Sequence, residues 1–195
     1  MHGVVPIQIT PDLVRAAWTV LPARWKLTVR DKRTATEMDV AGWLLAALGY
    51  QTREQFRLYT TTIGTVIYVP FTPGEPHAHY SLAGQLEVLA HEGRHGLDFL
   101  AAPIDFVESY GRDPALRTLH ESRGYRAGEA VRRRLGFDPS PLDHLAGHLK
   151  SYGVSDADIA VSRAFHVSST ATLDQGGVVD QAAADVIAFV SRRDR

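Results

Sequence analysis

The 195-residue chain contains no cysteine. Disulfide bonds and thiolate metal sites are therefore excluded, and any bound metal must be held by histidine, aspartate or glutamate. An excess of either charge is also lacking, because the formal net charge is -1. We therefore expect no broad electrostatic attraction to nucleic acid or to an anionic membrane surface.

Long apolar segments are missing as well. The longest runs, such as VAGWLLAALGY at 40–50, are too short to span a bilayer. The N-terminal sequence MHGVVPIQITPDLV has neither the charged nor the apolar region of a secretory signal. We therefore expect a cytoplasmic protein, with signal-independent export or carriage on a phage or toxin particle as the alternatives.

The pattern of apolar and turn residues predicts an α+β fold. Alternation and β-branched residues predict a strand at 26–30 and a β-hairpin over 56–71, with Gly64 dividing the hairpin. Pro70 predicts that the second hairpin strand ends there or lies at a sheet edge. Capping residues and prolines predict helices at 10–21, 34–48, 81–100 and 113–135, the second ended by Gly49 and the last by Gly136. Three more helices are expected at 141–151, 155–168 and 178–192.

The proline-rich stretch FDPSP at 137–141 is the best boundary in the chain. It separates a core at 1–137 from a helical C-terminal part at 138–195, which we expect to pack on the core as one domain. The expected architecture is a small sheet backed by helices.

Residues 91–95 read HEGRH and lie within the helix predicted at 81–100. Residues four positions apart lie about 40° apart around a helix axis, so His91 and His95 can face one ion. Glu92, next to the pair, is placed to act as a base on a metal-activated water rather than as a ligand. Two neutral imidazoles leave the charge of Zn²⁺ intact, so that the ion can activate a bound water. The same ligands also suit Co²⁺ and Ni²⁺.

The alternative to a metal site is a solvated helix face with two histidines. The His pair lies roughly opposite the apolar stripe, which suits open solvent as well as a cleft. The stripe consists of Leu86, Leu89, Ala90, Gly93, Leu97 and Leu100.

A catalytic zinc site uses three protein ligands plus water, so a third ligand is expected on another element. Glu121, 26 positions after His95, lies on the next long predicted helix and is the preferred candidate. Glu129, Glu108 and His120 remain as rivals. A solvated helix carboxylate is the alternative interpretation of Glu121.

At these residues the chain resembles the zincin metallopeptidases of the gluzincin type. The resemblance rests on HEGRH and on Arg-x-x-His-Glu-x-x-Gly-Tyr at 117–125, which is similar to the R-x-x-x-E-x-x-A-Y pattern of small bacterial and phage-encoded zincins. A strand similar to IYVPF at 67–71 precedes the HExxH helix in such proteins. The resemblance covers about residues 57–135. It implies a zincin-like fold, a Zn²⁺ cofactor held by His91, His95 and Glu121, and peptide-bond hydrolysis.

Better-defined zincin classes do not fit. The metzincin extension needs glycine at 98 and histidine or aspartate at 101, where this chain has Asp98 and Ala101. The aspzincin pattern needs aspartate at 107, where this chain has Val107. The assignment therefore stops at gluzincin-like.

Tyr125, one turn after Glu121, is a further catalytic candidate because its hydroxyl can donate to the oxyanion of a tetrahedral intermediate. A half-buried core tyrosine is the alternative. The pairs His77/His79 and His144/His148 are weaker metal candidates, interpreted mainly as solvent-exposed, and His166 as packing. Glu87 and Asp98 are candidates for hydrogen bonds to the ligand imidazoles, or else for surface ion pairs.

These observations predict a small zinc-dependent peptidase that acts on peptide or protein substrates. We expect the substrate to extend along an edge strand near 66–70. Two other functions stay open: a structural or interaction module with a non-catalytic metal site, and a hydrolase of cell-wall peptide crosslinks.

Overall fold

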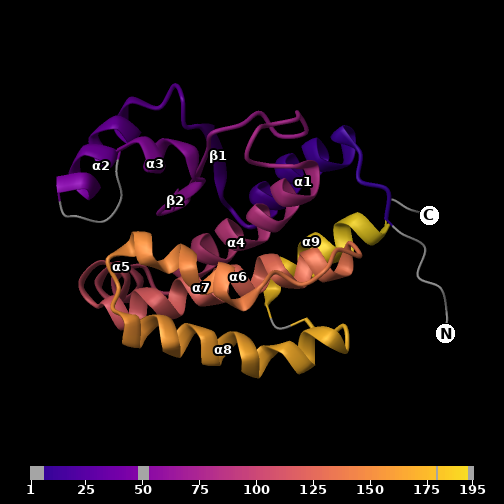
Figure 1. Cartoon of the computed structure of the whole chain (residues 1–195). Coiled ribbons are helices and arrows are strands. Elements are labelled where there is room, and N and C mark those ends of the chain that lie inside the picture. Colours follow the sequence, from indigo (N-terminus) through magenta and orange to yellow (C-terminus); the bar gives the residue numbers. More distant parts are fainter. Residues whose placement is uncertain (1–6, 48–52, 179, 193–195) are drawn as a thin grey trace.

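The computed structural model describes residues 7–47, 53–178 and 180–192. This part of the chain is mainly helical and includes a three-stranded sheet, so the α+β class is confirmed. Figure 1 shows the sheet and the N-terminal helices above helix α4, with helices α6 and α8 below it.

The helices and strands have the following bounds. The helices are α1 (Pro11–Arg24), α2 (Thr36–Ala47), α3 (Arg53–Leu58), α4 (Leu82–Ala101), α5 (Pro103–Arg112), α6 (Pro114–Arg134), α7 (Leu142–His148), the 3-10 helix η1 (Leu149–Tyr152), α8 (Asp156–Asp174) and α9 (Gln181–Arg192). The strands are β1 (Thr28–Asp31), β2 (Thr61–Ile63) and β3 (Val66–Val69).

Polar side chains start the long helices where the sequence predicts. The Ser81 hydroxyl accepts a hydrogen bond from the backbone N–H of Gly84 and starts α4. The Asp113 carboxylate accepts from two N–H groups and starts α6. Ser155 and Asp158 form a capping box at α8. Each cap satisfies donors that a helix N-terminus leaves without partners. The predicted end of α2 at Gly49 lies outside the described residues.

The sheet has the strand order β1-β3-β2. Strand β3 pairs with β2 in an antiparallel hairpin, and Gly64 has the positive φ of +61° that this tight turn requires. Strand β3 also pairs in parallel with β1. The prediction that the strand near 66–70 is an edge strand is therefore wrong, whereas the other expectation from Pro70, that the strand ends there, is confirmed because β3 ends at Val69. Strand β3 is the central strand, and β1 and β2 are the edge strands.

The predicted start of the hairpin at Phe56 is also wrong, because Arg53–Leu58 forms helix α3. Lys32 explains this in part. Its ammonium group donates to the carbonyls of Phe56 and Tyr59 and to the Thr61 hydroxyl, and it lies 3.8 Å from the centre of the Phe56 ring. These contacts stabilise a compact turn before β2. They depend on Lys32, which lies 24–29 positions earlier in the sequence than its partners.

Helix α4 lies at the centre of the molecule. It packs against α1, α5, α6 and α9 and against both strands of the hairpin. Two glycines let neighbours approach its backbone. A Cβ at Gly93 would lie 2.5 Å from the Trp25 ring, and one at Gly96 would lie 2.4 Å from the Leu27 side chain. The glycine of HEGRH therefore belongs to the core-facing side of α4.

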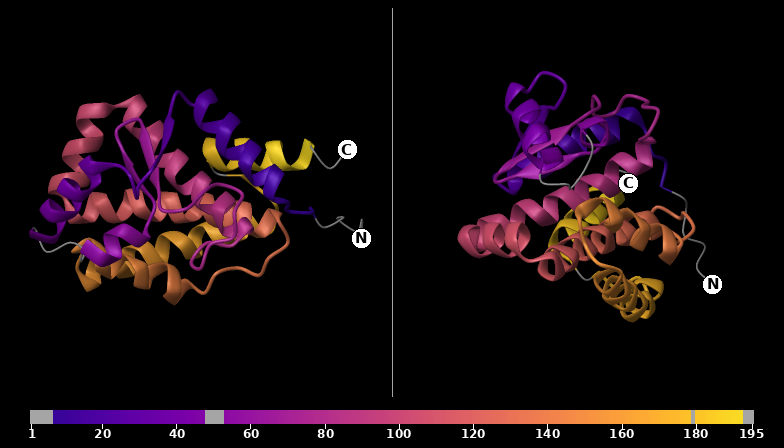
Figure 2. Two further views of the ribbon diagram at one scale, coloured as in Figure 1. Left: turned by 90° about the horizontal axis from the view of Figure 1, so that it is seen from above. Right: turned by 60° about the vertical axis from the view of Figure 1, so that its left-hand side comes forward.

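The C-terminal part shares its core with the rest of the chain. Ala182, Ala183, Val186 and Val190 of α9 belong to the main hydrophobic cluster. Helices α9 and α1 lie side by side, although they stand at opposite ends of the sequence (Figure 2). In contrast, α8 packs on α6 and α7 at the outer side of the molecule.

None of the helices in the described ranges combines the length and the apolar character that crossing a membrane requires.

Candidate metal centre

The site is built where α6 packs closely against α4. A Cβ at Gly124 of α6 would lie 2.9 Å from the His91 ring, and one at Gly128 would lie 3.1 Å from the Glu87 carbonyl oxygen. The two glycines are four residues apart and therefore share one face of α6. They bring that face close to α4, with Glu121 opposite the two histidines of HEGRH.

His91, His95 and Glu121 come together at this contact. Their nearest ligand atoms all lie within 4.8 Å of one another. The two Nε2 atoms are 3.0 Å apart, His91 Nε2 is 3.5 Å from Glu121 Oε2, and His95 Nε2 is 3.3 Å from Glu121 Oε1. The side chains of His91 and His95 are only 12% and 7% exposed, so the alternative of a solvated helix face is wrong.

Charge in the cluster is concentrated on Glu121. Burial alone would raise the pKa of this carboxyl, but His95 and His91 hold it well below its ordinary value. Burial alone would lower the pKa of His95, but Glu121 raises it above the ordinary value. The buried Glu121 carboxylate therefore favours a positive charge beside it, which a proton on His95 or a bound cation can supply.

Tyr110 of α5 fixes the carboxylate. Its hydroxyl donates to Glu121 Oε1 over 2.6 Å. Burial, and then the charge of Glu121, raise the pKa of Tyr110 well above its ordinary value, so the phenol keeps its proton and remains a donor. The other oxygen, Glu121 Oε2, is buried and has no hydrogen-bond partner among the described residues. A buried carboxylate oxygen of this kind calls for a ligand.

Glu92 lies beside the cluster and is itself buried. The Thr62 hydroxyl of edge strand β2 donates to Glu92 Oε2 over 2.7 Å and also lies 3.3 Å from the Glu92 carbonyl oxygen. This contact fixes the direction of the carboxylate and joins the edge strand to α4.

The cluster opens into a cavity of about 420 Å³. His91, Glu92, His95 and Glu121 line it together with strand β2 and the segment before it. Most of the remaining wall is apolar or aromatic, including Phe56, Ile63, Phe99, Phe106 and Val107. Such a cavity, apolar with a few convergent polar groups, is typical of small-molecule and peptide sites.

Three tyrosines that the sequence does not single out as site residues line the cavity: Tyr59, Tyr110 and Tyr152. Buried Arg117 holds Tyr110 and Tyr152, because its guanidinium donates to their backbone carbonyls over 2.8 and 2.7 Å. Arg117 is the first residue of the Arg-x-x-His-Glu motif at 117–121, and this motif is the sequence signal that points to Arg117. The sequence does not show that Arg117 binds the carbonyls of Tyr110 and Tyr152.

Tyr125 lies against His91, with ring centres 4.7 Å apart in an edge-on arrangement, and is not among the residues lining the cavity. Burial raises its pKa well above the ordinary value, while a hydrogen bond with the Tyr152 side chain lowers it in part. Its role as an oxyanion donor stays a prediction, and Tyr152 is the member of the pair that reaches the cavity.

The three rivals to Glu121 lie in other surroundings. Glu129 accepts from the Arg133 guanidinium and from the Ser140 N–H. Glu108 is exposed and pairs with Arg112. His120 contacts the Ser109 hydroxyl at 3.0 Å and Asp98 at 3.6 Å. The structure therefore brings Glu121 to the histidines and none of these three.

The expectation that Asp98 and Glu87 hydrogen-bond to the ligand imidazoles is wrong. Asp98 binds Arg94 and lies near His120, and Glu87 pairs with Arg132. The Nδ1 atom of His95 is buried and has no hydrogen-bond partner among the described residues. Both carboxylates therefore hold helices together rather than orient His91 or His95.

The remaining histidines of the described residues lie outside the centre. His79 is exposed in the loop before α4, and the half-buried His77 packs on Tyr80 and Phe71. His166 is buried in α8, as expected for a packing residue. His144 and His148 form a separate pair on α7, with Nε2 atoms 3.0 Å apart.

Comparisons of this chain with protein-family models, with curated proteins and with solved structures gave no match.

Proposed function

We propose that this protein is a zinc-dependent metallopeptidase of the gluzincin-like type. The observation that carries the proposal is a buried carboxylate, Glu92, facing the same cavity as the His91–His95–Glu121 cluster. A ligand set alone supports metal binding. A further carboxylate beside these ligands, in a cavity able to admit a substrate, supports hydrolysis.

The three residues fit a zinc ion. Two imidazoles and one carboxylate are the protein ligands expected of a catalytic zinc site, and they leave a position open for water or substrate. The buried Glu121 Oε2 atom has no hydrogen-bond partner among the described residues, although His91 Nε2 lies 3.5 Å away, and this fits an oxygen placed to bind an ion. Bound zinc would supply a Lewis acid that lowers the pKa of water and polarises a carbonyl.

Glu92 would act as the general base. Thr62 holds its carboxylate in one direction, so the group is oriented before substrate arrives. Glu92 accepts a proton from the attacking water and passes it to the leaving amine as the peptide bond breaks. Tyr152 and Tyr125 keep their protons at neutral pH, since burial raises both pKa values well above the ordinary value. Tyr152, backed by Tyr125, is the better placed donor to the developing oxyanion.

The edge strand β2 would align the peptide. It lines the cavity through Thr61, Thr62 and Ile63, and it pairs with β3 on one side. Within the described residues no strand pairs with its other side. An extended peptide can therefore add to that side by backbone hydrogen bonds, with its side chains in the cavity. The apolar walls formed by Phe99, Phe106 and Val107 favour an apolar side chain beside the scissile bond.

The test is hydrolysis of a diverse peptide library and of purified cell-wall peptides by zinc-loaded protein. We expect cleavage by the wild type, loss on chelation and recovery with zinc. Glu92→Gln should keep the metal and lose activity by about 10²–10⁴-fold, the usual contribution of a general base. Glu108→Gln, an exposed carboxylate outside the centre, is the matched control.

Zinc bound at one ion per chain without cleavage of any library member would favour the non-catalytic module. Near-normal activity of Glu92→Gln would contradict the role given to Glu92.

A further inference from the structure

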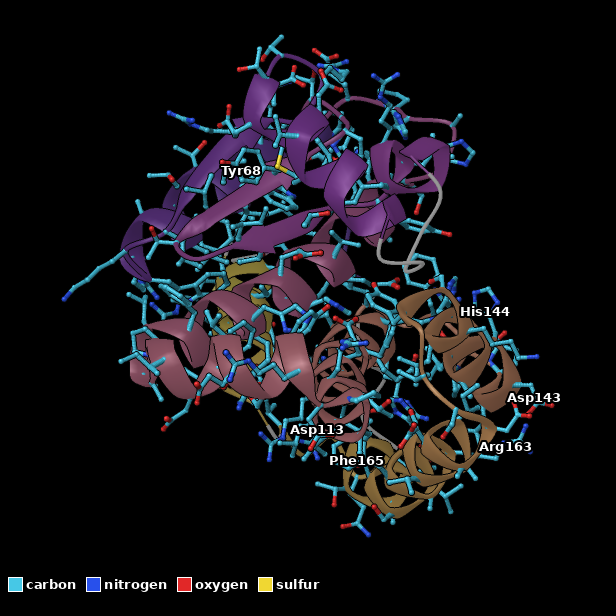
Figure 3. All side chains as sticks on the ribbon, turned by 90° about the vertical axis from the view of Figure 1, so that its left-hand side faces the viewer. Tyr68, Asp113, Asp143, His144, Arg163 and Phe165 are labelled. Carbon is cyan, nitrogen blue, oxygen red and sulfur yellow. The ribbon has the colours of Figure 1, made fainter. Side chains whose placement is uncertain are left out.

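We propose that His144 and His148 form a second, weaker binding site for a divalent transition-metal cation on α7. This inference goes beyond the peptidase proposal and does not depend on it. The two residues lie one helical turn apart, and Figure 3 shows His144 at the periphery of the molecule.

The geometry of this pair matches that of the pair on α4. The Nε2 atoms are 3.0 Å apart in both. The ring centres are 4.4 Å apart at 78° on α7 and 4.8 Å apart at 73° on α4. Metal–nitrogen bonds of about 2.0–2.1 Å place neighbouring ligand nitrogens roughly 3 Å apart. Both pairs therefore direct their nitrogens at one point suited to a cation.

The α7 pair is open to a cation from solution, because His144 is exposed and His148 is half-buried. Asp143, the carboxylate next to His144 in the sequence, pairs with Arg163 of α8 (Figure 3).

The second site should be weaker than the first. In the described ranges, His91, His95 and Glu121 are the one group of three ligand residues close enough to share an ion. The α7 pair supplies two imidazole ligands, and water must complete the shell. Two imidazoles suit Cu²⁺, Ni²⁺ and Zn²⁺.

The second site is linked to the first through one aromatic ring. His148 stacks on Tyr125, with ring centres 5.7 Å apart and planes 17° apart. The Tyr125 ring also contacts the His91 ring edge-on, with ring centres 4.7 Å apart. A cation that holds the His148 ring therefore also restrains Tyr125 beside the metal ligand His91.

The test is a titration of metal-free protein with Zn²⁺ and with Ni²⁺, in competition with a chromophoric chelator. We expect two ions per wild-type chain with different affinities. His144→Ala should keep the tighter ion and lose the weaker one, and Glu121→Ala should lose the tighter ion and keep the weaker one. His79→Ala, an exposed histidine of the His77/His79 loop, should keep both.

Ring resonances of His148 and Tyr125 in NMR spectra give a second measurement. In the wild type they should shift as the second equivalent binds, and in His144→Ala they should not. His144 is exposed, and thermal unfolding of the variant checks that its fold is retained. A single ion per wild-type chain would overturn the proposal. So would a second ion that His144→Ala retains or that His79→Ala loses.

Discussion

Two pairs of histidines four residues apart, His91/His95 on α4 and His144/His148 on α7, have the same separation of 3.0 Å between Nε2 atoms. Their surroundings differ. The α4 pair is largely buried, faces the Glu121 carboxylate and lines a cavity with Glu92. The α7 pair joins an exposed residue to a half-buried one and has no third ligand residue within reach among the described residues.

Histidine spacing therefore sets the distance between two imidazoles, but it does not bring a carboxylate to them. Helical geometry alone produces the spacing on both helices. What distinguishes α4 is a second long helix, α6, that Gly124 and Gly128 allow to pack close enough to bring Glu121 opposite the histidines. Helix α7 is seven residues long and packs on α8 instead.

The largest effect on the α4 pair is expected from a change that pushes α6 away from α4. Gly124→Ala would place a Cβ 2.9 Å from the His91 ring, so that ring must move. We expect zinc affinity at the α4 pair to fall by about 100-fold, the upper end for losing ligand orientation. We also expect stability to fall by about 1–3 kcal/mol from overpacking. Chelator competition and urea unfolding measure these two effects. Unchanged zinc affinity would mean that the close approach of the helices does not build the site.

A smaller change removes the support of the one anionic ligand. Tyr110→Phe deletes the hydroxyl that donates to Glu121 Oε1. We expect zinc affinity to fall by about 10–100-fold, as for other groups that orient a ligand. Tyr125→Phe, which alters the neighbour of His91 rather than of Glu121, should have the smaller effect on affinity. The reverse order would show that the carboxylate needs no fixing by Tyr110.

His166 separates the effect of burial from that of a carboxylate partner. Burial, and then Arg126, lower its pKa to about 4, whereas Glu121 raises the pKa of buried His95. In the unfolded chain His166 takes up a proton near pH 6.5, so the unfolded state binds more protons than the folded state below that pH. The free energy of unfolding should therefore fall as the pH drops from about 6.5 to about 4, by on the order of 2 kcal/mol from this residue.

The check is urea unfolding at several pH values between 4 and 7. His166→Leu should show a shallower dependence on pH than the wild type. Equal slopes for the two proteins would mean that His166 is not held neutral in the folded state.

The smallest expected effect lies between the histidines of α7. A Cβ at Gly147 would meet nothing within 4 Å, unlike one at Gly124. Gly147→Ala should therefore stabilise the protein by about 0.5–1 kcal/mol through helix propensity and leave metal binding at both pairs unchanged. Thermal unfolding and metal titration provide the comparison. A loss of stability would show that α7 is more tightly packed than this structure indicates.

Local signals in the sequence were enough for part of this account. Ser81 and Asp113 fix the starts of α4 and α6 because capping depends on the next three residues alone. The positions of His91, Glu92 and His95 on one helix follow from the same local rule. The α+β class followed from the alternation of 26–30 and from the β-branched and aromatic residues of 56–71.

Long-range contacts determine the features of the fold and of the site that could not be predicted from the sequence. Strand β3 is central because β1 pairs with it in parallel from 38 positions away, which no local pattern records. Glu121 is the preferred ligand in the sequence, but Glu129 stays a rival there, and the close contact of Gly124 with His91 separates them. Thr62, Tyr110 and Tyr152 enter the site from three different elements, so their roles emerge only when those elements are packed together.

The most direct test is the zinc content of purified wild type and of Glu121→Ala by elemental mass spectrometry under mild chelation, with Glu129→Ala as the control. The account predicts about one tightly held zinc per chain in the wild type and in Glu129→Ala, and loss of that ion in Glu121→Ala. A wild type without stoichiometric metal, or a Glu121→Ala variant that keeps its zinc while Glu129→Ala loses it, would contradict the centre described on α4 and α6.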